Sequence, residues 1–118
     1  MYKCGYRLPM EHSMNQNIQN KHIHTLEIFI YIKLNEKESM LNYKKIDELV
    51  ENYLEQYNGK YLNEMEQWQE VSPTIENLGD FFYLQLSELL EKHQYHLVML
   101  EISETPLRTY RVTGRMGG

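Results

Sequence analysis

The stretch 21–34, KHIHTLEIFIYIKL, constrains the fold most, because its polar and apolar side chains alternate. Two histidines and a series of aliphatic residues share one parity: His22, His24, Leu26, Ile28, Ile30, Ile32 and Leu34. The other parity is dominated by Lys21, Thr25, Glu27, Tyr31 and Lys33. Side chains of a β-strand point alternately to two faces, whereas a helical pattern repeats about every 3.6 residues. The stretch therefore predicts a long β-strand with one apolar face.

His22 and His24 belong to the same face of this strand, with Cα atoms about 6.6 Å apart at the usual rise per residue. Two imidazoles at this spacing can reach one metal ion. A pair of partly exposed histidines at a strand entrance would look the same, so His-x-His alone leaves both interpretations open.

Residues 2–14 alternate in the same way and predict a first strand, with His12 on its apolar parity near the end. Pro9 lacks a backbone donor, so we expect this strand at a sheet edge or with a bulge. The polar loop 15–20 would join the two strands as antiparallel neighbours and carry His12 back beside His22 and His24. Three imidazoles with a fourth position open form the ligand set of a catalytic zinc site. That convergence assumes a loop geometry which spacing alone does not fix.

The period changes after residue 40. Apolar residues at intervals of three and four predict an amphipathic helix from Tyr43 to about Asn58-Gly59, where glycine suits the left-handed cap. Ser72-Pro73 predicts the start of a second helix, which ends at Lys92 or His93.

Strand character returns at 95–103, where Glu104 closes the run, and again at 109–112. The order ββααββ predicts an α+β fold, with a four-stranded antiparallel sheet carrying two helices on one face. We expect one domain over residues 1–113 and a flexible tail over 114–118.

Composition narrows the class of protein. Among 118 residues, 17 are acidic and 12 are basic, and the basic residues are scattered. This argues against a nucleic-acid or anionic-membrane partner. No stretch resembles a signal peptide, and no apolar run approaches the roughly 20 residues that span a bilayer, so we expect a cytoplasmic protein.

Several short motifs together resemble one protein family. In chain order they are His12, the His-x-His of His22 and His24, the segment 60–63 (KYLN), the segment 73–77 (PTIEN) and the pair Glu104-Thr105. The chain resembles the 6-pyruvoyl- and 6-carboxy-tetrahydropterin synthases, which adopt the tunnelling fold (T-fold). Ile23 stands where the family usually has glycine between the two histidines.

The resemblance implies a role for each matching residue. His12, His22 and His24 would be the ligands of Zn²⁺, and Glu104 with Thr105 would bind a pterin or purine-like ring. A carboxylate can accept two parallel hydrogen bonds from such a ring. Without the resemblance, a solvated residue at a strand end would be the simpler interpretation of Glu104. The family also implies a homo-oligomer, a hexamer built as a dimer of trimers.

The chain departs from the family at its proton-transfer groups. Ile18 stands where the family has a cysteine, and Asn58 and Gly59 stand where it has an Asp-His pair. Cys4 is no simple replacement, because about 26 Å of extended strand separates it from His12. The catalytic residues therefore stay unidentified.

Two functions remain open. One is a zinc-dependent pterin synthase-type lyase acting on dihydroneopterin triphosphate or a related pterin, with low activity or an altered substrate. The other is a non-catalytic pterin- or purine-binding module, or an assembly protein on the same scaffold. The sequence does not choose between biopterin, folate and deazaguanine (queuosine) chemistry.

Overall fold

The computed structural model describes residues 1–12, 22–34, 41–60, 65, 74–105 and 107–114. At positions 11–12 and 22–24 the description covers the backbone. The elements follow the order β1 (Tyr2–His12), β2 (His22–Leu34), α1 (Tyr43–Glu55), α2 (Ile75–Glu91), β3 (Tyr95–Thr105) and β4 (Arg108–Thr113). The predicted order ββααββ is thus confirmed.

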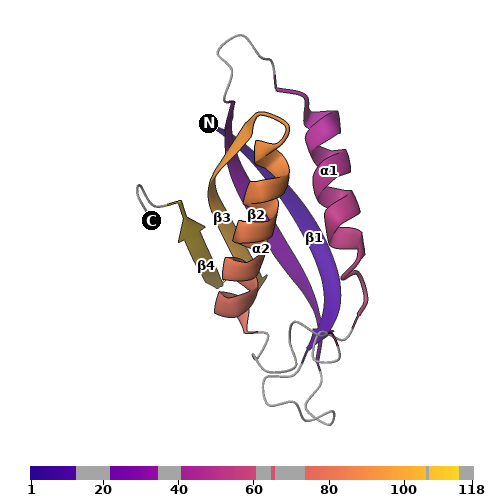
Figure 1. Ribbon diagram of the computed structural model, residues 1–118. Coiled ribbons are helices and arrows are strands. Elements are labelled where there is room, and N and C mark those ends of the chain that lie inside the picture. The colour runs from indigo at the N-terminus through magenta and orange to yellow at the C-terminus, as the bar shows by residue number, and fades with distance from the viewer. Residues whose placement is uncertain (13–21, 35–40, 61–64, 66–73, 106, 115–118) are drawn as a thin grey trace.

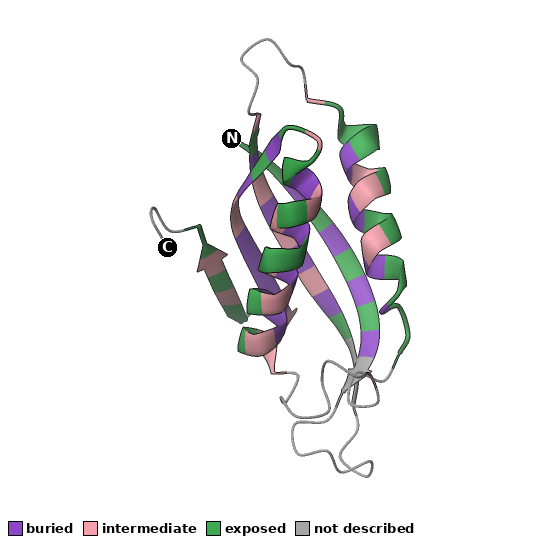
Figure 2. Ribbon diagram, in the orientation of Figure 1, coloured by how far each residue is buried: buried purple, intermediate pink, exposed green. Residues whose placement is uncertain are grey.

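The strands form one four-stranded antiparallel sheet in the order β1-β2-β3-β4, so β1 and β4 are its edges (Figure 1). Both helices lie on the same side of this sheet, as the sequence predicts (Figure 1). The alternation of buried and exposed residues along β1 is visible in Figure 2. The sheet contributes these residues to the core: Cys4, Tyr6, Leu8, Met10, Leu26, Ile28, Ile30, Ile32, Tyr95, Leu97, Leu100 and Ile102. One face of the sheet is therefore buried under α1 and α2. No helix of the described residues covers the other face, which we call the bare face.

Helix α1 is shorter than predicted. Asn42 caps its start, where the side chain accepts a hydrogen bond from the Lys45 amide. The helix ends at Glu55, and a turn follows in which Gly59 has φ 71°. The Gly59 amide donates to the Pro9 carbonyl at 2.6 Å. Pro9 thus lies on an edge strand, as expected, and its carbonyl accepts a hydrogen bond from the turn after α1.

Helix α2 begins at Ile75 with Thr74 as its N-cap, whose hydroxyl accepts a hydrogen bond from the Asn77 amide. Such a contact satisfies one of the amides that have no partner within the helix. The predicted cap at Ser72 and Pro73 lies outside the described residues. The helix ends at Glu91, one residue before the predicted end at Lys92.

Candidate binding cleft and metal site

Glu104 lies on a β-bulge in β3. Ser103 pairs with Thr109, and the next pair toward the hairpin joins Thr105 to Arg108. Glu104 is therefore the extra residue and has no Cα partner on β4. A bulge of this kind bends a strand and re-aims side chains, and bulges are common beside binding sites.

A cleft of about 510 Å³ lies between the start of α2 and the β3–β4 hairpin. Its volume lies within the usual range for small-molecule sites. Its lining residues are Thr74, Ile75, Glu76, Glu104, Thr105, Arg108, Thr109 and Tyr110. The structure thus places the two predicted substrate-binding residues, Glu104 and Thr105, in one cleft.

Two carboxylates and a tyrosine are among the side chains that line the cleft. Glu104 is half-buried, and Glu76 lies in the first turn of α2, where the helix dipole favours negative charge. The Tyr110 hydroxyl donates a hydrogen bond to Oδ1 of Asp80 at 2.8 Å. Its ring lies so close to α2 that a Cβ atom on Gly79 would come within 2.7 Å of it. The position of the Tyr110 side chain therefore depends on a glycine at residue 79.

The strand register brings the three predicted metal ligands close together along the backbone. His12 pairs with His22 and His24 pairs with Met10, so the three positions occupy two rungs of the same parity. Their side chains lie outside the described part of the chain, and no group of three possible metal ligands is found among the described side chains. The donor set suits Zn²⁺, which commonly takes three histidines and an open position in catalytic sites. The zinc site stays a prediction.

The cleft and the histidines lie at the same end of the sheet. Glu27 pairs with Ser103, so the chain beyond Ser103 runs beside the part of β2 that leads back to His24. The β1 end that carries His12 and the start of α2 are also at this end (Figure 1). An anchored ring and a metal ion could therefore be neighbours.

Cys4 is far from this end and lies in the core under the helices. Burial raises the pKa of its thiol, so the thiolate needed for base catalysis is disfavoured. Asn58 and Gly59 belong to the turn that contacts β1, and Ile18 lies outside the described residues. Among the described residues, Cys4, Asn58 and Gly59 therefore do not replace the proton-transfer groups that the family resemblance implies.

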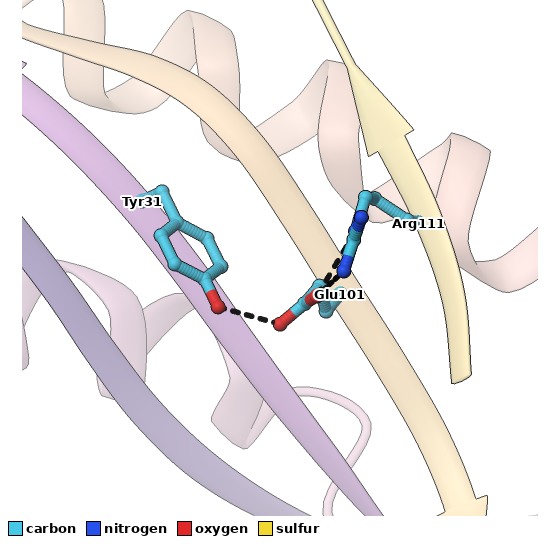
Figure 3. A network of polar contacts seen from close by, with 3 residues as sticks. All are labelled: Tyr31, Glu101 and Arg111. Atoms are coloured by element: carbon cyan, nitrogen blue, oxygen red, sulfur yellow. Dashed lines mark hydrogen bonds and ion pairs between the residues drawn. The ribbon is translucent and has the colours of Figure 1, made fainter. Parts of the chain in front are cut away.

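A second polar group, which the sequence analysis missed, lies on the bare face of the sheet (Figure 3). Oε1 of Glu101 accepts a hydrogen bond from the Tyr31 hydroxyl at 2.7 Å, and Oε2 accepts two from Arg111 at 2.7 and 3.0 Å. Glu101 is only 9% exposed. The hydrogen bond from Tyr31 is the main cause that lowers the pKa of this carboxyl, followed by Arg111. The signal in the sequence was an acidic residue in the middle of an otherwise apolar strand.

The comparisons with known proteins agree on fold. A family model described as 6-pyruvoyl tetrahydropterin synthase matches residues 1–115. The structure of Caenorhabditis elegans 6-pyruvoyl tetrahydropterin synthase superposes with a TM-score of 0.80 at 15% identity, covering 97% of this chain and 94% of that one. An uncharacterized protein from Wolinella succinogenes superposes with a TM-score of 0.66 at 10% identity, covering 97% and 98%. A search of curated proteins gives no match.

The T-fold prediction is confirmed by the first of these structures. No helix among the described residues is long and apolar enough to cross a membrane.

Proposed function

Because the chain belongs to the 6-pyruvoyl tetrahydropterin synthase family, we propose that it binds a pterin or a related purine-like ring in the cleft at Glu104. The observation that supports this most directly is the bulge, which places a half-buried carboxylate on a cleft of suitable size. The Glu104 carboxylate would accept two parallel hydrogen bonds from a ring N–H and an exocyclic amine, which fixes orientation as well as affinity. Thr105 lines the same cleft and would contact the ring from the end of β3.

We further propose that His12, His22 and His24 hold Zn²⁺ and that the protein is a pterin synthase-type lyase acting on dihydroneopterin triphosphate or a related pterin. The backbone register supports this, since it sets the three histidine positions on neighbouring rungs. When bound, the metal would supply Lewis-acid polarisation of hydroxyl and keto groups on the pterin side chain. The chain's own part would be to anchor the ring at Glu104.

Proton transfer would depend on water or on a side chain not yet identified. Ile18 stands where the family resemblance leads us to expect a cysteine, and Asn58 and Gly59 stand where we expect an Asp-His pair. General acid–base catalysis typically contributes about 10² to 10⁴-fold to a rate. We therefore expect a slow enzyme or one with an altered substrate.

A non-catalytic pterin- or purine-binding or assembly protein is the second candidate. It is favoured by Gly59, which occupies a left-handed turn position and donates its amide to Pro9. A titratable side chain at this position would strain the backbone.

Both candidates include a cytoplasmic homo-oligomer, a hexamer built as a dimer of trimers. The support is the edge on each side of the sheet, at β1 and β4, where no further strand pairs among the described residues. Pairing of such edges between subunits would satisfy their free backbone groups.

Metal content and turnover test the proposal together. Plasma mass spectrometry on protein purified without chelators should give nearly one zinc per chain, and His24→Ala should lose it. Lys33→Ala, a change elsewhere on β2, is the control and should keep the metal. Incubation with dihydroneopterin triphosphate, followed by chromatography of the pterins, then tests the lyase.

The outcomes separate the candidates. Zinc with a pterin product supports the enzyme. Zinc and pterin binding with no product at high protein concentration supports the binding protein. A folded protein that stays metal-free after zinc addition contradicts the zinc-dependent lyase.

A further inference from the structure

The cleft contains an arginine that the family resemblance gives no role. Arg108 lines it together with Glu76 and Glu104. Its side chain is exposed, and within the described residues the structure shows no ion pair between Arg108 and either carboxylate. Its guanidinium is therefore available to a ligand in the cleft.

The hairpin holds Arg108 close to the proposed ring anchor. Thr105 is the last residue of β3 and Arg108 the first of β4, and the two are paired across the ladder. Glu104 is the bulged neighbour of Thr105. Because Arg108 is paired at the first rung of the hairpin, its backbone is held in a fixed position relative to Glu104.

The charge of Arg108 determines whether the cleft can accept an anionic ligand. Without it, the charged side chains that line the cleft are the two carboxylates of Glu76 and Glu104. Such a cleft would disfavour an anionic group, because like charges repel at short range. A guanidinium offers paired donors that match a carboxylate or a phosphate.

We propose that Arg108 makes the cleft selective for a ring that carries an anionic substituent, a carboxylate or a phosphate, over the same ring with a neutral one. Glu104 would accept the donor edge of the ring, and Arg108 would donate to the substituent. This inference rests on the proposed pterin-binding function, and it names the residue that sets the preference for charge.

The test compares two probes that differ at one substituent, 6-carboxypterin and 6-hydroxymethylpterin. Pterin fluorescence is titrated with the full-length protein, its Arg108→Gln and Arg108→Lys variants, and Lys44→Gln. Lys44 lies in the first turn of α1, away from the cleft, so its variant removes the same unit of charge without touching the cleft. Neopterin phosphate serves as a third probe and distinguishes a phosphate on a longer arm from a carboxylate on the ring.

We expect the native protein to bind at least one anionic probe about fivefold more tightly than the neutral one, as is reasonable for an exposed charge pair. Arg108→Gln should remove this preference, so that the variant binds the anionic probes and 6-hydroxymethylpterin with similar affinity. Arg108→Lys should keep part of the preference for the anionic probe, and Lys44→Gln should keep all of it. Raised salt should weaken the preference.

Equal affinity of the native protein for all three probes would overturn the inference, as would a preference that survives Arg108→Gln. In both results pterin binding itself stands. Failure of all three probes to bind would instead overturn the proposed pterin-binding function, and this inference with it.

Discussion

The Tyr31 hydroxyl donates a hydrogen bond of 2.7 Å to Oε1 of Glu101 and so links β2 to β3 on the bare face of the sheet. Arg111 donates to the other carboxylate oxygen from β4, so one buried carboxylate joins three strands (Figure 3). Hydrogen bonds to the charged form lower the pKa of a carboxyl. The stability of the sheet should therefore depend on pH through Glu101.

Tyr31→Phe should reduce this acid sensitivity. Because the folded-state pKa of Glu101 is lowered, its contribution to stability is present above its unfolded pKa of about 4.3 and is lost as the pH falls through the folded value. The variant should lower the free energy of unfolding by about 1 kcal/mol at pH 7, and by less at pH 3. Urea unfolding at both pH values measures this.

Tyr43→Phe is the control, since Tyr43 is 53% exposed and lies on α1. It should change stability little at either pH. An equal loss for Tyr31→Phe at both pH values would show that the hydroxyl acts independently of the ionisation of Glu101.

Tyr6→Phe should flatten alkaline unfolding. The Tyr6 hydroxyl donates to Oδ1 of Asp47 at 2.8 Å, and burial together with this contact raises the pKa of the phenol. A raised folded-state pKa gives stability that is present below the unfolded value of about 10 and is lost as the pH rises beyond it. The variant should cost about 1 kcal/mol at pH 8. Circular dichroism between pH 8 and 11.5 should show a shallower decline for the variant.

Gly79→Ala should destabilise the protein although alanine favours helices by about 1 kcal/mol over glycine. A Cβ atom there would come within 2.7 Å of the Tyr110 ring and 3.0 Å of the Ile102 side chain. We expect a net loss of about 1 to 2 kcal/mol, measured by urea unfolding. In a Tyr110→Ala background, Gly79→Ala should cause a smaller loss of unfolding free energy, because the clashing ring is absent. Gln85→Ala, at an exposed position of α2, should leave stability nearly unchanged or raise it.

Glu104→Gln should weaken pterin binding about tenfold or more, since glutamine offers one acceptor where the carboxylate offers two and removes the charge assistance. Fluorescence titration with 6-hydroxymethylpterin measures it. Glu88→Gln removes the same charge from an exposed position of α2 and should bind normally. An unchanged affinity for Glu104→Gln would place the ring elsewhere.

The fold was predictable because the information for it is local. Alternation in β1 and β2 and the three- and four-residue intervals of the helices reflect which residues face one core. The end of α1 was wrong for a physical reason: Tyr57 is only 2% exposed and continues the apolar stripe, although its backbone belongs to the turn after Glu55. Burial alone does not distinguish a helical residue from a turn residue.

The sites depend on pairing between distant segments, so the sequence revealed them in part. The resemblance pointed to Glu104, but its bulge follows from the register between β3 and β4. The contacts of Glu101 with Tyr31 and Arg111 needed the register of three strands. The three histidines were placed by parity, and coordination of zinc by them stays a prediction.

The bulge also limits how this chain can change during evolution. Between Ser103 and Thr105, β3 has one residue more than the stretch of β4 that it faces. Deleting one residue there would make the hydrogen-bond ladder continuous. It would also move the side chains that follow the deletion in β3 to the opposite face of the sheet. A mutation that makes the sheet more regular would thus dismantle the cleft. Variation in length is better tolerated at the hairpin tip beyond Thr105, where added residues leave the phase of β3 unchanged.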